Sequence, residues 1–395
     1  MTSAPQTTML TALVPQAPVH KRQIDIPLEV IEHFLSFVNI DIKKTHLACS
    51  LTCRKWRAAC MPFLFSSLSK GYSRRLIDLL ALGQAHRSRD FVCSVRKLVV
   101  SEGIMTAKLF MTILKTFPKL RHLQLSFPIF ELGPSWEVPA GHPTFELDAL
   151  TIVKGFNDRY YRHDILPDLF RAFTRINTLT LEGAWRFSAS AVRTFSVPLQ
   201  VHNIAGAASV HLWLRLLRNT KTNVDQTLQS VQVHVESGGA EQVGQLLSAG
   251  GANVRSLHVY FGDALYDARP GDILKISSCR HLTHAIFDFS AMTGNYQTSW
   301  QFVWNLVSSL PPDSFTSLRF VELERLIVPD VRTGDESGLK GLQAALVPLH
   351  SLKEVTIAST SVTLRRSVEA YKSFVGRLML PTETGYRLAF EDPRY

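Results

Sequence analysis

Three of the five cysteines lie close together in the sequence and are the first candidates for metal chemistry. Cys49, Cys53 and Cys60 fall on one face of a helix that continues until Pro62. On a continuous helix Cys49 and Cys60 are about 16 Å apart, too far to share one zinc ion. We therefore expect reduced thiols that pack in an apolar interior, with no disulfide and no metal site.

Two histidines near Asp288 are the next candidates for a metal site. His281 and His284 lie three residues apart in a stretch with strand-like composition, so their side chains point to opposite faces. The chain also lacks the GxSxG, GxxxxGK, GxGxxG and HExxH motifs that mark hydrolases, nucleotide-binding proteins and metalloproteases. We predict that the chain is not an enzyme and requires no cofactor.

An apolar pattern recurs from residue 94 onward, with apolar residues at the first, fourth and sixth positions of each match. The matches are Val95-Leu98-Val100, Leu120-Leu123-Leu125, Leu147-Leu150-Ile152, Ile176-Leu179-Leu181, Leu228-Val231-Val233, Val254-Leu257-Val259, Leu282-Ala285-Phe287, Leu318-Val321-Leu323 and Leu352-Val355-Ile357. Successive matches begin 25, 27, 29, 52, 26, 28, 36 and 34 residues apart, and the gap of 52 predicts a degenerate unit near Val201 and Ile204. This period is typical of leucine-rich repeats, each a strand followed by a helical return.

Helical patterns fill the segments between these matches, at 107–117, 165–173, 210–218, 240–249, 300–310 and 339–347. One such unit cannot cover its own apolar face, so stacked neighbours must do so. We predict an α/β fold: an N-terminal three-helix segment followed by a solenoid with a parallel concave sheet and helical returns. The alternative is an ordinary nine-stranded α/β sheet, but the Gly-rich first turn of a doubly wound sheet is missing.

Polar residues alternate with the apolar ones in each predicted strand, which directs them to the concave face. We predict that this face binds a protein target. The candidate residues are Gln124, Thr180, Gln232, His258, Tyr260, Phe320 and Glu322. Their mixture of aromatic, histidine and acidic side chains suits a basic or polar peptide, and the alternative is a solvated face without a ligand.

Residues 24–68 have the pattern of three short helices. The residues on the first helical face are Leu28, Ile31, Leu35 and Val38. So small a unit cannot bury enough apolar surface to be stable alone, and Leu28, Phe34 and Phe37 are left over. We expect these residues to contact either the rest of the chain or another protein.

The order of residues in this segment resembles an F-box. The matching stretches are Ile26-Pro27-Leu28-Glu29-Val30-Ile31, Leu35-Ser36-Phe37 and Leu47-Ala48-Cys49-Ser50-Leu51-Thr52-Cys53-Arg54-Lys55-Trp56-Arg57. The family opens with a Leu-Pro-x-Glu type of helix and closes with a Val-Cys-Arg-x-Trp type, so Ile26 and Thr52 are departures from its pattern. With the repeats that follow, the chain is similar to F-box proteins with irregular leucine-rich repeats, a type frequent in fungi.

The resemblance implies a substrate-recognition adaptor of an SCF-type E3 ubiquitin ligase. The F-box would dock on a Skp-type adaptor, and through it on a cullin, while the repeats hold an unknown protein target. The adaptor-binding residues that it implies are Pro27, Leu28, Ile31, Leu35, Leu51 and Trp56. The alternative is a structural or scaffolding repeat protein whose N-terminal helices only cap the array.

The composition is that of a globular protein, with 46% hydrophobic and 19% charged residues among 395. No apolar run reaches the roughly 18 residues that a membrane span needs, so we expect a soluble protein of the cytoplasm and/or nucleus. Residues 1–130 hold 18 Lys/Arg and 7 Asp/Glu, which accounts for the net charge of +10. This excess favours an acidic protein partner over nucleic acid, because aromatic residues do not alternate with the basic ones.

The predicted organisation has five parts. They are a disordered tail (1–22), an F-box (23–68), a linker or first helical return (69–93), leucine-rich repeats (94–360) with about ten units, and a C-terminal cap (361–395).

Overall fold

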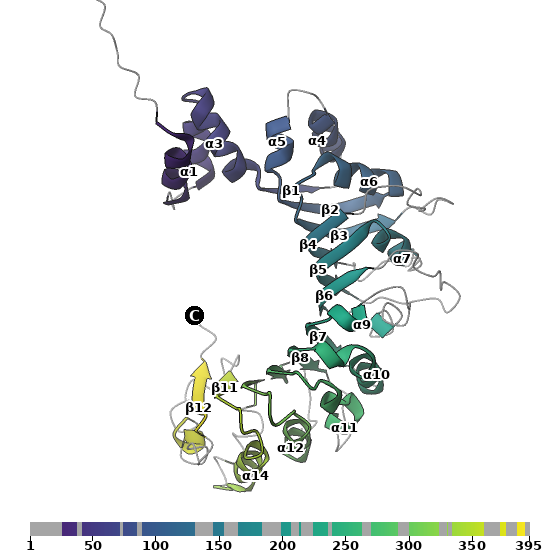
Figure 1. Cartoon of the computed structure of the whole chain (residues 1–395), viewed down its shortest axis with the longest axis vertical. Helices are drawn as coiled ribbons and strands as arrows, with labels where there is room; N and C mark the ends of the chain where they lie inside the picture. The colour runs from purple at the N-terminus through teal and green to yellow at the C-terminus, as the bar shows by residue number, and fades with distance from the viewer. Residues whose placement is uncertain are drawn as a thin grey trace, which may run out of the picture. The chain divides into compact units, whose positions relative to one another are not determined.

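The computed structural model divides the chain into two compact units, unit 1 (Met1–Leu64) and unit 2 (Phe65–Tyr395) (Figure 1). The structure describes residues 26–37, 42–71, 74–84, 89–130, 145–153, 165–183, 199–206, 213–214, 224–235, 239–262, 270–290, 300–323, 330, 334–358, 372–376 and 385–391. Within these residues, no helix is long and apolar enough to cross a membrane.

Unit 1 contains three short helices, α1 (Leu28–Phe37), α2 (Ile42–Ser50) and α3 (Arg54–Phe65). Helix α1 begins after Pro27, whose carbonyl oxygen accepts the backbone N–H groups of Val30 and Ile31. The missing N–H of a proline has no consequence at this position, because the first N–H groups of a helix have no intrahelical partner.

The prediction of one continuous helix from Cys49 to Pro62 is wrong, because α2 ends at Ser50 and α3 begins only at Arg54. The hydroxyl groups of Ser50 and Thr52 donate to the backbone carbonyl oxygens of Leu47 and Cys49, at 2.6 and 2.7 Å. Such local bonds from short polar side chains offer the backbone an alternative to the helix.

Pro62 does not end α3, which continues to Phe65. A proline inside a helix removes one backbone hydrogen bond. Phe63 and Leu64 follow it and pack against the core of unit 1, so their burial offsets that loss.

The helix break also invalidates the distance argument for the cysteines. Cys49 packs against the same core that contains Cys60, so the two thiols lie near each other. Burial raises the pKa of the Cys60 thiol, and the nearby Cys49 raises it further. In the part of the chain that the structure describes, no group of three or more His, Cys, Asp or Glu side chains is arranged to hold a metal ion.

Unit 2 is built on a single open sheet of twelve parallel strands that follow one another in chain order. The strands are β1 (Ser67–Gly71), β2 (Lys97–Met105), β3 (His122–Phe130), β4 (Phe145–Val153), β5 (Phe173–Glu182), β6 (Gln200–Ala205), β7 (Ser230–Val235), β8 (Ser256–Phe261), β9 (His284–Asp288), β10 (Ser317–Val321), β11 (Glu354–Ala358) and β12 (Arg387–Glu391). A doubly wound sheet would reverse its strand order, and this one does not. The predicted α/β fold with a parallel sheet and helical returns is therefore confirmed.

The helices of unit 2 connect successive strands. They are α4 (Arg74–Gln84), α5 (Arg89–Ser94), α6 (Ala107–Thr116), α7 (Ile165–Phe170), α9 (Val224–Thr227), α10 (Ala240–Gly250), α11 (Pro270–Leu274), α12 (Trp300–Ser308) and α14 (Ser337–Leu346), with 3₁₀ turns η2 (Gly251–Asn253) and η3 (Ile276–Ser278). Figure 1 shows α6, α10, α11, α12 and α14 on one side of the strands, which leaves the other side as the concave face. The predicted segment 210–218 is described only at 213–214, which are helical.

The core of unit 2 lies between the strands and the helices. One buried apolar residue from each of ten strands forms a continuous row, from Leu98 through Leu123, Leu150, Leu179, Ile204, Val231, Leu257, Ala285 and Leu318 to Val355, with Leu68 preceding them on β1. Burial of a leucine or valine side chain contributes about 1.5–3 kcal/mol, so the repeated row supplies much of the stability of the sheet.

The degenerate unit predicted near Val201 and Ile204 is confirmed as β6. Gly206 follows it with a φ of 114°, a conformation that other residues rarely adopt. A Cβ at this position would overlap the carbonyl oxygen of Leu181 on β5. The third apolar residue of the pattern is therefore absent because the backbones approach too closely to admit it.

β1 begins at Ser67, inside the stretch assigned to the F-box, and pairs with β2. The stretch 69–93, assigned to a linker or first helical return, contains α4 and most of α5. Within the stretch assigned to a C-terminal cap, 361–395, β12 pairs with β11 and extends the sheet. Residues 372–376, in the same stretch, are helical.

The apolar pattern assigned to β10 is wrong by three residues. Leu318 pairs with Ala285 and Val355, and Phe320 pairs with Phe287 and Ile357, so the repeat unit is Phe315-Leu318-Phe320. The overlapping match Leu318-Val321-Leu323 also consists of buried residues. Val321 is in register with Asp288 of β9 and Ala358 of β11, whereas Leu323 lies after the end of β10, beyond Glu322 with its φ of 58°.

Candidate functional site

The side chains on the concave face form three rows that cross the sheet. The start row is Ser67, Lys97, His122, Ala149, Thr178, Asn203, Ser230, Ser256, His284, Ser317, Glu354 and Arg387; the middle row is Ser69, Val99, Gln124, Thr151, Thr180, Ala205, Gln232, His258, Ile286, Arg319, Thr356 and Ala389; the end row is Gly71, Ser101, Ser126, Val153, Glu182, His234, Tyr260, Asp288, Val321, Ala358 and Glu391. Five predicted target-binding residues belong to these rows: Gln124, Thr180, Gln232, His258 and Tyr260.

Phe320 and Glu322 are not on this surface, which corrects their assignment as target-binding residues. Phe320 is fully buried among core residues of the neighbouring strands. Glu322 is also buried, and it lies after the end of β10. The residues of β10 in the three rows are Ser317, Arg319 and the buried Val321, and the misplaced pattern concealed them.

The backbone at the start of the strands is regular. The carbonyl oxygen of Arg96 accepts the N–H groups of Arg121 and His122, at 2.7 and 2.9 Å, and Arg121 repeats this towards β4. Gln229, Arg255, Thr283 and Thr316 each make the same pair of bonds to the next strand. This repeated pair of backbone hydrogen bonds keeps the three rows in register. The spacing of apolar residues in the sequence does not predict it.

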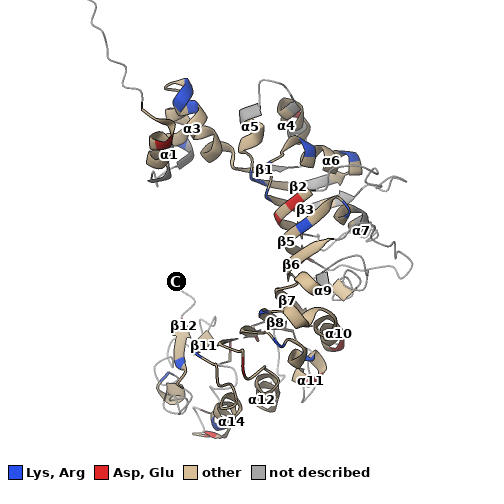
Figure 2. Ribbon diagram, in the orientation of Figure 1, with Lys and Arg blue, Asp and Glu red and all other residues tan. Residues whose placement is uncertain are grey.

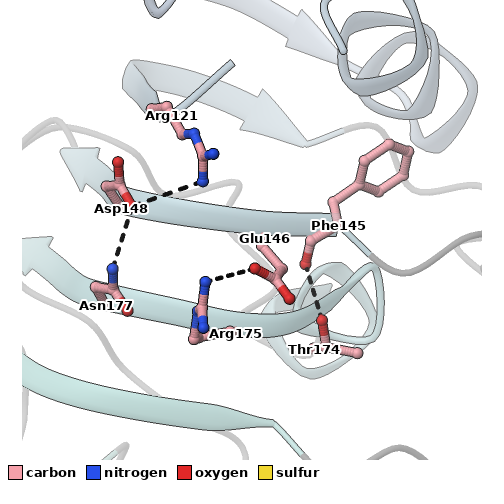
Figure 3. Close-up of polar contacts among 7 residues, drawn as sticks. All are labelled: Arg121, Phe145, Glu146, Asp148, Thr174, Arg175 and Asn177. Atoms are coloured by element: carbon pink, nitrogen blue, oxygen red, sulfur yellow. Dashed lines mark hydrogen bonds and ion pairs between the residues drawn. The ribbon is translucent and has the colours of Figure 1, made fainter. Parts of the chain in front are cut away.

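Polar side chains link the starts of β3, β4 and β5 (Figure 3). Asp148 lies 4.0 Å from the guanidinium of Arg121 and accepts a hydrogen bond from Asn177 at 3.1 Å. Glu146 and Arg175 form an ion pair of 2.5 Å in the adjacent position. In Figure 2, acidic and basic segments lie side by side on these strands. Exposed pairs of this kind each contribute about 0–1 kcal/mol, so they align strands more than they create a site.

Gln124 and Thr180 lie near this region in the middle row. The amide of Gln124 donates to the hydroxyl of Ser126 at 3.1 Å. Both residues are half-buried between small neighbours such as Thr151 and Ala205. They contribute hydrogen-bonding capacity, but the structure does not bring them together with the other predicted target-binding residues.

Gln232, His258 and Tyr260 do come together, at β7 and β8. The Gln232 side-chain amide donates to the Tyr260 hydroxyl at 3.1 Å. The Tyr260 ring stacks on His258, with centroids 4.0 Å apart, and on His234 from the neighbouring strand, at 4.3 Å. The tyrosine is therefore held between two imidazole rings, and its orientation is fixed by the amide.

Asp288 completes this cluster from β9. One carboxylate oxygen accepts the backbone N–H of Ser290 at 2.8 Å, and the other lies 3.8 Å from Nε2 of His258. Burial opposes ionisation of Asp288, but the neighbouring His258 and the bonds from Ser290 outweigh it, so its pKa lies below the ordinary value. Burial and the Asp288 charge raise the pKa of Tyr260, which stays protonated at neutral pH. We call these five residues, Gln232, His234, His258, Tyr260 and Asp288, the ring cluster.

Unit 1 presents a second candidate surface. Of the predicted adaptor-binding residues, Pro27 and Leu28 are exposed, and Leu51 is 80% exposed. Trp56 is half-buried and packs edge-on against Phe34, with centroids 6.1 Å apart. These side chains are accessible to a partner, at least in part.

Ile31 and Leu35 must be corrected, because they form the core of unit 1 with Ala59 and Cys60. His46 is buried beside this core and stacks on Phe63. A helical face as wide as α1 needs some of its residues for the unit's own interior, and the apolar spacing alone cannot distinguish them from residues that face outward.

Three exposed apolar residues of unit 1 were not predicted: Ile26, Val30 and Leu47. Together with Leu28, Phe34 and Leu51, they make up the apolar surface of unit 1. Ile26, Val30 and Phe34 are spaced four residues apart, which would have identified a second apolar face of the first helix. Val30 and Phe34 are more than half exposed, so this face extends well beyond the predicted residues.

No family model matches this chain, and no curated protein matches it. Among solved structures, the chain is similar to the leucine-rich repeat-containing protein LegL7 from Legionella pneumophila. The sequence identity is 15%, the match covers 83% of each chain, and the TM-score is 0.42.

Proposed function

We propose that this chain is the substrate receptor of an SCF-type ubiquitin ligase. Unit 1 would dock on a Skp-type adaptor, and unit 2 would bind a protein target on its concave face. The chain itself would be non-catalytic and would act in the cytoplasm and/or nucleus. Ubiquitin transfer would take place on other subunits, and its rate would depend on how the target is held near them.

The observation that supports this proposal best is the apolar surface of unit 1. Its six residues, Ile26, Leu28, Val30, Phe34, Leu47 and Leu51, are exposed although the unit already has its own core. Exposed apolar residues in such number on one small unit commonly mark a protein-interaction site. The F-box-like order of residues in this unit indicates the class of partner.

Capture of a purified Skp-type adaptor by the full chain tests the proposal. Leu28→Asp with Leu51→Asp places charges on the apolar surface without touching the core, so we expect binding to fall by at least about a hundredfold. Ile77→Asp is the matched control, because Ile77 of α4 is equally apolar and 62% exposed but belongs to unit 2. Undiminished capture by the double variant would contradict the docking role.

The second candidate is a structural or scaffolding repeat protein whose N-terminal helices only cap the array. Removal of residues 1–64 separates the two functions, because this deletion leaves β1 intact. Under the receptor function, residues 65–395 should remain soluble and keep their thermal transition. Under the scaffold function, loss of a cap would expose the first repeat and cause aggregation.

A further inference from the structure

The ring cluster combines a buried carboxylate with three stacked aromatic rings on the concave face. The side chain of Asp288 is only 10% exposed, and among the described residues its ion-pair partner is His258, which is charged only when protonated. A buried carboxylate is stabilised by a matched cation and hydrogen bonds, and one without them is costly. Ser290 donates to one oxygen of Asp288, and His258 Nε2 lies 3.8 Å from the second oxygen, so a closer cationic donor would stabilise this carboxylate further.

Among the described residues of the sheet, no lysine or arginine forms an ion pair with Asp288. The end row holds the carboxylates of Glu182, Asp288 and Glu391 and, among its described members, neither lysine nor arginine. Arg319, on the strand after Asp288, forms its ion pair with Glu391 at 2.7 Å. The residues immediately before the start row include Arg96, Arg121, Arg255 and Lys353, at the opposite ends of the strands. The end row therefore suits a positively charged ligand.

The remaining members of the ring cluster also favour a cation. Gln232 uses its amide N–H to bond Tyr260, so its carbonyl oxygen stays available as an acceptor. Tyr260 lies between two imidazoles, which gives the cluster an aromatic wall beside the carboxylate. An ammonium or guanidinium group is attracted to the face of an aromatic ring such as that of Tyr260.

We propose that the ring cluster binds the cationic side chain of a lysine or arginine in a protein target. This inference rests on the proposed role of the repeats as the target-binding part of the chain. The cation would lie over the stacked rings and donate hydrogen bonds to Asp288 and to the Gln232 carbonyl. Charge complementarity at the strand ends selects a basic segment of the target rather than an acidic one.

Short synthetic peptides and NMR of the full chain test this site. The chain is labelled with ¹³C in its nine tyrosine rings, and Tyr260→Phe identifies the Tyr260 signal by its loss. Three blocked tripeptides, Gly-X-Gly with X as arginine, citrulline or glutamate, are titrated to about 10 mM, a range suited to weak single-residue binding. Citrulline has the shape of arginine without its charge, so it isolates the electrostatic contribution.

The arginine peptide should shift the Tyr260 signal, and the citrulline and glutamate peptides should not. Asp288→Asn should weaken the arginine affinity about tenfold or more, as expected for loss of a charge-assisted hydrogen bond. Glu391→Gln is the matched control, since it removes a carboxylate of the same row that is already paired, and it should leave the affinity unchanged. Equal shifts from arginine and citrulline, a response to glutamate alone, or no shift with any peptide would each overturn the inference.

The wild-type comparison of arginine with citrulline needs no variant, so it stands even if Asp288→Asn fails to fold. The outcome is also separable from that of the proposed function. Loss of adaptor capture alongside a retained arginine shift would reject the ligase role and keep the cation site. Retained adaptor capture without an arginine shift would reject only the cation site.

Discussion

Asp288 and His258 show how individual residues on the concave face respond to their surroundings. They come from neighbouring strands, and Nε2 of His258 lies 3.8 Å from a carboxylate oxygen of Asp288. Burial alone would raise the pKa of Asp288, but His258 and Ser290 favour its charged form, so its pKa is lower in the folded chain. The pKa of nearby Tyr260 is raised, so at neutral pH the Asp288 carboxylate is charged and the Tyr260 phenol is not.

This lowered pKa predicts how the stability of unit 2 depends on pH. The unfolded chain binds the proton of Asp288 more tightly, so the ionised carboxylate stabilises the folded chain above its ordinary pKa of about 3.9. The contribution disappears as the pH falls through the lower folded-state pKa. Asp288→Asn should therefore unfold at a lower temperature than wild type at pH 7. Its free energy of unfolding should be smaller by about 1 kcal/mol.

Thermal unfolding of both proteins at pH 7 and at progressively lower pH measures this difference. The difference in free energy of unfolding between wild type and variant should decrease on acidification. The other carboxylates titrate equally in both chains, so their contributions cancel. A difference that stays constant or widens towards low pH would show that Asp288 is not ionised in the folded chain.

Among the elements, α12 and α14 have an unusually close contact. Trp300 and Trp304 of α12 lie against Gly338 and Gly341 of α14, and a Cβ at either glycine would overlap an indole ring. The Trp304 indole N–H donates to the carbonyl oxygen of Gly338 at 3.1 Å. Two glycines thus provide the groove into which two aromatic side chains fit, and the long return between β10 and β11 is anchored there.

Gly341→Ala should destabilise this packing by about 1–3 kcal/mol, because the added methyl group forces the Trp304 indole out of its position. Unfolding in urea, followed by tryptophan fluorescence, measures the loss. Gly376→Ala is the matched control: Gly376 has open space around its Cα, so the same substitution should cause no loss. Equal effects of the two substitutions would argue against a tight helix contact.

At the scale of the whole molecule, the strand order of unit 2 limits how far the effect of a substitution can spread. Every strand of the sheet pairs only with its neighbours in the sequence. Stability in such an array is approximately a sum of unit terms and nearest-neighbour terms. Local opening should therefore remain local, unlike in a protein with a single central core.

Leu257→Ala and Leu98→Ala test this expectation as a pair, since both residues are fully buried in the same row. Each should cost about 2–5 kcal/mol through the cavity it leaves. Hydrogen exchange followed by mass spectrometry should show lost protection in β7–β9 for the first variant and in β1–β3 for the second. Identical exchange profiles for the two variants would indicate one cooperative core instead.

The sequence by itself determined the repeat architecture. A strand has a side-chain period of two, so the spacing of Leu98 and Val100 and its counterparts predicts the strands, their inner faces and their order. It also predicted Gln232, His258 and Tyr260 as concave residues, because alternation alone separates the two faces. Tertiary structure added His234 and Asp288 as their partners, because contacts between strands depend on register.

Only the tertiary structure decided between overlapping patterns. Phe315-Leu318-Phe320 and Leu318-Val321-Leu323 are equally apolar, and pairing with β9 and β11 selected the first. Likewise, Ile31 became core whereas Leu28 stayed exposed on the same helix. Hydrophobicity determines that a residue leaves water where it can, but the neighbouring segments determine which residues are covered.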